Sequence, residues 1–154
     1  LEEAVSELLK KEGLTLSSAE SCTGGMLSSR ITDLPGASQI FKGSVCAYAN
    51  EVKTDVLSVP LELIEQYGAV SEQVARSMAE NVRTLLKTDI GVSITGVAGP
   101  AASEQKPVGT VWFAIASEKR TTAITYKLGN GRNRIRVSSV NRALDLVRRH
   151  IMDI

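Results

Sequence analysis

Hydrophobic residues recur along the 154-residue chain with two different spacings, and the chain alternates between them several times. Spacings of three and four residues indicate amphipathic helices, whereas short apolar runs bounded by turn residues indicate strands. On this basis we predict helices over 1–12, 26–32, 51–57, 60–66, 72–87 and 132–152. We predict strands over 14–19, 43–49, 90–95, 109–117 and 121–128.

Glycine, proline and polar capping residues mark the ends of these elements. Gly13 and Gly68 are expected to end two helices, and Pro60 can open one because its fixed φ suits the first helical turn. Asn50 and Ser71 are predicted N-caps, since their side chains can accept a hydrogen bond from the start of a helix. The final helix is expected to face inward through Ile135, Val140, Leu144, Val147 and Ile151.

The alternation of strands with helices predicts an α/β fold, namely one three-layer α/β/α sandwich. The strands over 109–117 and 121–128 are separated by only three residues, so they should form a hairpin that makes the sheet mixed rather than parallel. A chain of this length corresponds to one domain, and we expect a single domain over 1–154.

Composition and charge exclude several classes of protein. The 18 Lys and Arg against 17 Asp and Glu give a net charge of +1, which lacks the basic excess of a general nucleic-acid binder. No apolar run reaches the length of a membrane span and the first twelve residues are acidic, so we predict no span, no signal peptide and a cytoplasmic location. Cys22 and Cys46 could form at most one disulfide, which favours a reducing compartment. With two cysteines and one histidine, His150, no metal site is expected.

Candidate chemistry appears first in AESCTGG at 19–25, between a predicted strand and a predicted helix. Gly24 and Gly25 let the backbone approach a ligand closely, and N–H groups at a helix start can face an anion or an oxyanion. Ser21 then has the position of a nucleophile, with Thr23, Gly24 and Gly25 as substrate contacts. The alternative interpretation is that Ser21 and Thr23 only cap the helix.

A second candidate group lies in YANEVK at 48–53, where a strand end leads into a helix. Because the one histidine is close to the C-terminus, a serine nucleophile would need lysine rather than histidine as its base. Lys53 suits this role if burial or nearby cations lower its pKa. Asn50 shares a helix face with Lys53, and Tyr48 precedes it by five residues. The alternative is an exposed lysine without a chemical role.

Two further segments have features of a ligand site. Thr95 and Gly96 end an apolar strand at the expected carboxyl edge of the sheet, where ligands of open α/β folds bind. Arg132, Arg134 and Arg136 begin the last helix, where they oppose the helix dipole unless an anion such as phosphate compensates. The alternative for the segment at Thr95 and Gly96 is a connection without a ligand. The alternative for the three arginines is that solvent surrounds them.

Five segments together resemble the C-terminal domain of the competence-damage-inducible protein CinA, a family that includes the nicotinamide mononucleotide deamidases. They are AESCTGG at 19–25, YANEVK at 48–53, GAVS at 68–71, ITGVAGP at 94–100 and KPVGTVW at 106–112. The segments occur in the family's order and cover essentially the whole chain. Two stretches depart from the family pattern: AASE at 101–104 replaces a glycine-rich stretch, and NGR at 130–132 stands where GDR is usual.

The resemblance implies a metal-free amidohydrolase, without cofactor, that converts nicotinamide mononucleotide to nicotinate mononucleotide and ammonia. Ser21 would be the nucleophile, Lys53 the base, and Tyr48 would orient Lys53 or the substrate. The expected substrate contacts are Thr23, Gly24, Gly25, Asn50, Thr95, Gly96 and Arg132, with Arg132 at the phosphate.

Alternatives to this enzyme remain open from the sequence. The first is a regulatory module that binds a nucleotide without turnover, and the second is a protein-interaction module in which Ser21 and Lys53 lie outside any cleft. Cys22 is a rival nucleophile, because a cysteine at a helix start can have a lowered pKa. We expect a small-molecule nucleotide as the partner, neither nucleic acid nor membrane, and a homo-oligomer.

Overall fold

The computed structural model describes residues 1–129 and 131–154 and contains a five-stranded mixed sheet in the order β2-β1-β3-β4-β5. The strands are β1 Leu16–Glu20, β2 Phe41–Cys46, β3 Ile90–Gly96, β4 Thr110–Ala116 and β5 Thr121–Lys127. Strand β1 pairs in parallel with β2 and β3, while β4 is antiparallel to β3 and β5. The three parallel strands therefore end together, at Glu20, Cys46 and Gly96, on one edge of the sheet.

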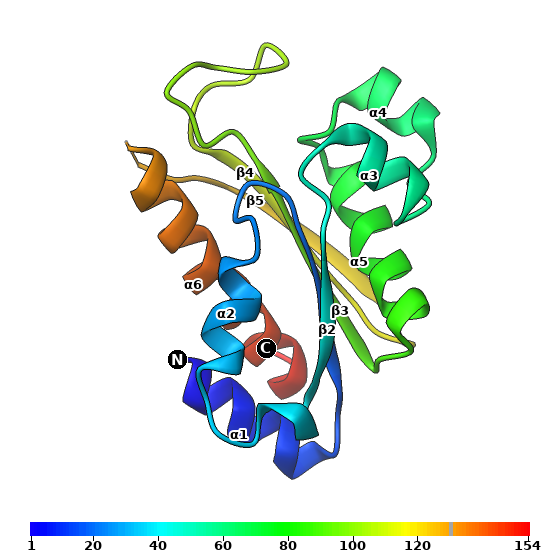
Figure 1. Cartoon of the computed structure of the whole chain (residues 1–154), viewed down its shortest axis with the longest axis vertical. Coiled ribbons are helices and arrows are strands. Elements are labelled where there is room, and N and C mark those ends of the chain that lie inside the picture. The colour runs from blue at the N-terminus through cyan, green and yellow to red at the C-terminus, as the bar shows by residue number, and fades with distance from the viewer. Residues whose placement is uncertain (130) are drawn as a thin grey trace.

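Helices cover both faces of the sheet, which confirms the predicted three-layer α/β/α sandwich (Figure 1). One face carries α1 Glu2–Glu12, α2 Met26–Thr32 and α6 Arg132–Met152. The other face carries α3 Asn50–Asp55, α4 Leu61–Tyr67 and α5 Glu72–Leu86. A short 3-10 turn, η1 Ala37–Gln39, precedes β2.

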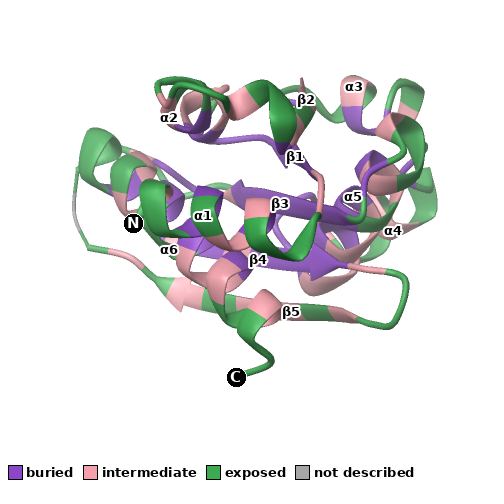
Figure 2. Cartoon of the chain, turned by 90° about the horizontal axis from the view of Figure 1, so that it is seen from below, coloured by how far each residue is buried: buried purple, intermediate pink, exposed green. Residues whose placement is uncertain are grey.

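Each face of the sheet has its own apolar core, and the buried residues lie along the strands and the inner helix faces (Figure 2). Under α6, the predicted inward positions Ile135, Val140, Leu144 and Val147 are buried. On the opposite face, α5 lies very close to the strands, because a Cβ on Gly91 would come within 2.2 Å of a carbonyl oxygen of that helix. Glycine at this position therefore lets the middle of α5 pack directly against the start of β3.

Most predicted elements are present, with shifted boundaries. Strand β1 ends on Glu20 rather than one residue earlier, and β2 runs over Phe41–Cys46 rather than 43–49. The prediction of Asn50 as an N-cap is wrong: the Ala49 carbonyl already accepts the first helical N–H groups, so Asn50 is the first helical residue.

Other local predictions have clearer outcomes. Ser71 is confirmed as the N-cap of α5, since its hydroxyl accepts the N–H of Val74. The predicted turn over 129–131 includes Asn130, which lies outside the described residues. Within the described ranges, no helix is long and apolar enough to cross a membrane.

Candidate active site

Ser21 and Lys53 come together at the carboxyl edge of the sheet, where Lys53 Nζ lies 3.0 Å from Ser21 Oγ. Ser21 directly follows β1, and its N–H continues the sheet by donating to the Ile94 carbonyl at 2.9 Å. Lys53 lies on α3, which follows the neighbouring strand β2. The parallel pairing of β1 with β2 thus brings together two residues that are 32 positions apart.

The surroundings of Lys53 favour an amine that can lose its charge. Its side chain is only 1% exposed, and Nζ also donates to the carbonyls of Ala47 at 2.8 Å and Tyr48 at 3.1 Å. Burial lowers the pKa of Lys53, and the negative charge of Glu104 opposes this effect. The charged amine donates to these two carbonyls and to Ser21 Oγ. Once it loses the third proton, two N–H groups stay on the carbonyls and the lone pair faces the Ser21 hydroxyl. The geometry fits a lysine that accepts the serine proton.

Glu20, the residue before Ser21, fixes the turn between β1 and α2. Its fully buried carboxylate accepts hydrogen bonds from Thr23 Oγ1 at 2.8 Å, Leu27 N at 2.9 Å, and Ser28 N and Oγ at 3.1 and 2.6 Å. A helix start leaves N–H groups without intrahelical partners, and here a carboxylate from within the chain takes two of them.

Because Glu20 takes these donors, the start of α2 does not face a ligand as the sequence predicted. Thr23, Gly24 and Gly25 do not line the cavity: Thr23 is fully buried, and the Gly24 N–H donates to the Ser21 carbonyl at 3.1 Å. The two glycines serve the turn itself, where their φ angles are +56° and +99°.

Arg136 also supports this turn rather than the predicted anion site. Its guanidinium donates to the carbonyls of Cys22 at 3.0 Å and Thr23 at 3.1 Å. Arg134 is exposed and lies outside the cavity. Of the three arginines at the start of α6, only Arg132 lines the cavity beside Ser21 and Lys53.

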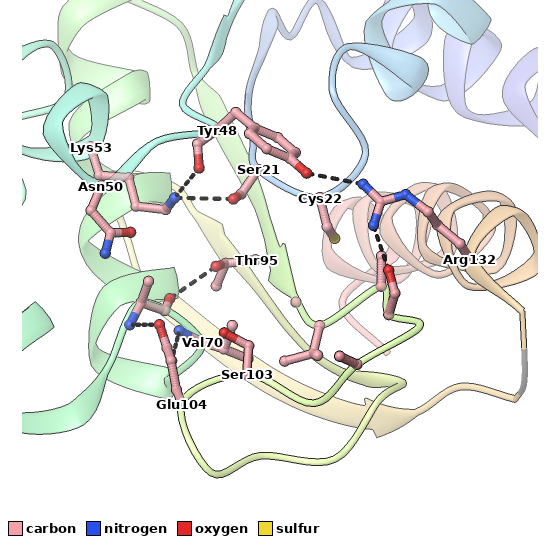
Figure 3. Close-up of a pocket in the computed structure, with 16 residues that line it drawn as sticks. Ser21, Cys22, Tyr48, Asn50, Lys53, Val70, Thr95, Ser103, Glu104 and Arg132 are labelled. Carbon is pink, nitrogen blue, oxygen red and sulfur yellow. Dashed lines mark hydrogen bonds between the residues drawn. The ribbon is translucent and has the colours of Figure 1, made fainter.

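A cavity of about 270 Å³ opens beside the Ser21–Lys53 pair (Figure 3). This volume is near the lower end of the range for small-molecule pockets. Its lining residues come from five separate parts of the sequence: 21–22, 48–53, 69–70, 95–104 and 132. The loop between β3 and β4, the connection between α4 and α5, and the start of α6 therefore complete a site that β1 and β2 begin.

Arg132 and Tyr48 lie together at the cavity. The Arg132 guanidinium donates to the Tyr48 hydroxyl at 3.0 Å and to the Gly99 carbonyl at 2.6 Å. Tyr48 contacts Lys53 through its main-chain carbonyl, while its side chain is 59% exposed. Asn50 also lines the cavity. The tyrosine hydroxyl thus pairs with Arg132, and only the tyrosine backbone holds Lys53.

Thr95 and Gly96 both line the cavity, as the sequence predicted. The Thr95 hydroxyl donates to the Ala69 carbonyl at 2.9 Å, and this hydrogen bond links β3 to the segment before α5. A Cβ on Gly96 would lie 2.7 Å from Val111 Cγ2, so glycine is required here by the packing of β4.

Glu104 is a residue of this cavity that the sequence analysis missed. Its carboxylate oxygens accept the N–H groups of Ala69 at 2.9 Å and Val70 at 3.1 Å. These partners lie 34 and 35 positions away, so no local spacing reveals the contact. The one available signal was an acidic residue within a loop expected to reach the ligand site.

Cys22 lines the same cavity but lacks the environment of a nucleophile. Burial raises the pKa of its thiol to about 11, so the thiol is protonated at neutral pH. Cys46 is exposed, and both cysteines are free. Residues 1–129 and 131–154 contain no group of three or more His, Cys, Asp or Glu side chains that could hold a metal ion.

Comparison with known proteins gives consistent matches over almost the whole chain. The family model described as the CinA C-terminal domain matches residues 1–151. A CinA-like protein of Dictyoglomus thermophilum is 48% identical over 155 residues, which cover 100% of this chain and 38% of that protein. The chain thus spans about 37 to 38% of the length of the first curated relatives it matches.

Solved structures with the same fold are also similar in sequence. A CinA superfamily protein from Klebsiella pneumoniae has a TM-score of 0.96 and 28% identity, covering 99% of this chain and 96% of its own. The competence/damage inducible protein CihA from Agrobacterium tumefaciens has a TM-score of 0.89 and 34% identity, covering 95% and 92%.

Proposed function

Because the chain belongs to the CinA C-terminal domain family, we propose that it is an amidohydrolase acting on nicotinamide mononucleotide. The products are nicotinate mononucleotide and ammonia. The observation that carries this proposal is the 3.0 Å contact between Ser21 Oγ and a buried Lys53 at the wall of a cavity. A module that only binds a nucleotide has no need for a buried lysine whose amine contacts a serine hydroxyl, so this contact favours turnover.

In the first half of the reaction, Ser21 Oγ attacks the carboxamide carbon while Lys53 Nζ takes the serine proton. The carbonyl oxygen becomes an oxyanion in the tetrahedral intermediate. Cys22, the residue after the nucleophile, lines the cavity, and we assign its backbone N–H to this oxyanion. The carbon–nitrogen bond then breaks, Lys53 returns its proton to the leaving nitrogen, and ammonia departs.

In the second half, water hydrolyses the ester left on Ser21. Lys53 removes one proton from the attacking water and then gives it to Ser21 Oγ as the ester bond breaks. The nicotinate mononucleotide leaves, and both side chains return to their starting states. The carbonyls of Ala47 and Tyr48 hold the lysine amine in place through both halves.

The direct test is ammonia release from nicotinamide mononucleotide by the wild type, Ser21→Ala, Lys53→Met and the double variant. Each single substitution should lower kcat by about 1,000-fold, because the two residues act as one unit, and the double variant should be little worse. Lys42→Met is the matched control, since Lys42 is exposed on β2 and away from the cavity, and it should keep wild-type rates. A wild type that binds the nucleotide but releases no ammonia would contradict the proposal and favour the regulatory module.

A further inference from the structure

The carboxylate of Glu104 is held in a fixed place on the cavity wall. Its Oε1 accepts the Ala69 N–H at 2.9 Å, and its Oε2 accepts the Val70 N–H at 3.1 Å. Two successive backbone donors thus bind one carboxylate, an arrangement in which charge strengthens both hydrogen bonds.

Two neighbours of this carboxylate restrict it further. Gly68 leaves room for it, because a Cβ there would lie 2.5 Å from Glu104 Oε2. Lys106 Nζ lies 3.4 Å from the same oxygen and donates to the carbonyls of Tyr67 and Val70. The loop between β3 and β4 is therefore fastened to the connection between α4 and α5.

The fixed carboxylate lines the same cavity as Lys53 (Figure 3). Lys53 itself forms no ion pair within the described residues, since its amine contacts two carbonyls and the Ser21 hydroxyl. The other titratable or charged groups around Lys53 are Cys22 after β1, Cys46 on β2, Tyr48 before α3, Glu51 on α3 and Arg132 on α6.

Among these groups, Glu104 combines a carboxylate with a fixed position. Cys22 is protonated at neutral pH because of its burial, and Glu51 is exposed to solvent, which screens its charge. Burial is the largest influence on the pKa of Lys53 and lowers it, and Glu104 is the strongest of the charges that raise it.

We infer that Glu104 is a positioning residue for the Ser21–Lys53 pair, whose fixed negative charge acts across the cavity on Lys53 and counteracts the effect of burial on that lysine. Its hydrogen bonds to Ala69 and Val70 keep that charge in place. The inference relies on the proposed function only for the role of Lys53 as the base.

The test is a direct titration of Lys53 that needs no turnover. Protein labelled with ¹³C at lysine Cε is titrated by NMR, and the Lys53 signal is identified by its loss in Lys53→Met. Glu104→Gln keeps the shape of the side chain and removes its charge. The midpoint of the Lys53 titration should fall by about half a pH unit or more, because the neutral amine is favoured once the negative charge is absent.

Lys106→Met is the matched variant that separates charge from packing. Both substitutions loosen the same loop, and better access of water would raise the midpoint in both. Loss of the Lys106 cation also raises the midpoint. We therefore expect the Lys53 midpoint to fall in Glu104→Gln and to rise in Lys106→Met.

Movement of both midpoints in the same direction, or no movement in Glu104→Gln, would overturn the inference. If Glu104→Gln does not fold, Glu104→Met is titrated in its place, and a midpoint that stays or rises is the contradicting result. If the two variants shift the midpoint in opposite directions but the wild type releases no ammonia, the electrostatic role of Glu104 is supported and the amidase activity is rejected.

Discussion

At the scale of single residues, the environment of Lys53 links its proposed role as a base to the stability of the fold. Burial lowers its pKa in the folded protein below the ordinary value of 10.5, which applies to the unfolded chain. Between these two values the unfolded chain binds the proton more tightly than the folded protein does. The charged lysine therefore opposes folding at low pH, and this cost disappears as the pH rises toward 10.5.

The free energy of unfolding should show this dependence when the wild type is compared with Lys53→Met. The wild type should gain stability relative to the variant as the pH rises from the folded-state pKa toward 10.5, at a slope of up to about 1.4 kcal/mol per pH unit. Urea denaturation at several pH values measures this difference. A difference that stays constant with pH would mean that burial does not lower the pKa of Lys53 in the folded protein.

The two cysteines should differ sharply in reactivity. Cys46 is exposed, whereas Cys22 is buried with a thiol pKa raised to about 11. Iodoacetamide at pH 8 should therefore modify Cys46 quickly and Cys22 slowly, as mass spectrometry of the two peptides would show. Cys22→Ser should keep most of the activity, and a rate as low as that of Ser21→Ala would instead identify Cys22 as the nucleophile.

At the scale of elements, the loop between β3 and β4 depends on a glycine in another connection. Gly68 has a φ of +83°, and a Cβ there would meet Glu104. Gly13 has a similar φ of +64°, but a Cβ there would meet nothing within 4 Å. The backbone of Gly68, at ψ 161°, is less accessible to a residue with a side chain than the left-handed turn of Gly13, at ψ 32°. Activity, rather than stability alone, therefore reports the displacement of the carboxylate.

Gly13→Ala should lower the free energy of unfolding by about 1 kcal/mol, the cost of a left-handed conformation for a residue with a side chain. Gly68→Ala should cost more than this and should also lower activity, because Glu104 must move away from Ala69 and Val70. Thermal unfolding and the ammonia assay measure the two effects. Unchanged activity in a folded Gly68→Ala variant would show that the Glu104 contact does not matter.

The elements and the closeness of Ser21 and Lys53 could be predicted from the sequence, whereas the contacts that hold these two residues could not. Periodicity and turn residues indicate the helices and strands, and the lack of a usable histidine directs attention to Lys53. Glu20 was missed because its donors become visible only once β1 and α2 are placed. Glu104 was missed because its partners lie on a distant connection. Long-range hydrogen bonds carry no short-range pattern.

At the scale of the whole molecule, the topology divides the cavity into two walls. The adjacent parallel strands β1 and β2 lead to Ser21 and Lys53, while Thr95 and Arg132 come from β3 and α6. Of the three arginines expected to face an anion, only Arg132 lines the cavity. The guanidinium of Arg136 instead donates to carbonyls of the turn after Ser21.

Arg132→Ala should raise the KM for nicotinamide mononucleotide about tenfold or more and change kcat much less, since it removes binding that is equal in the ground and transition states. Exposed Arg134→Ala is the matched control, with the same change of charge on the same helix but outside the cavity. The nucleoside without phosphate should mimic Arg132→Ala in the wild type. Equal efficiency with nucleoside and nucleotide would exclude a phosphate contact.

The order of the two walls along the chain has a practical consequence for redesign. The proposed Ser21–Lys53 pair and the Glu20 carboxylate lie within residues 16–53, and the cavity-lining residues outside this stretch lie within residues 69–132. A library for new amide substrates can therefore be confined to the second stretch, with the first kept constant. Glu104 should be held constant as well, because a library that varies it would change the working pH together with the substrate range.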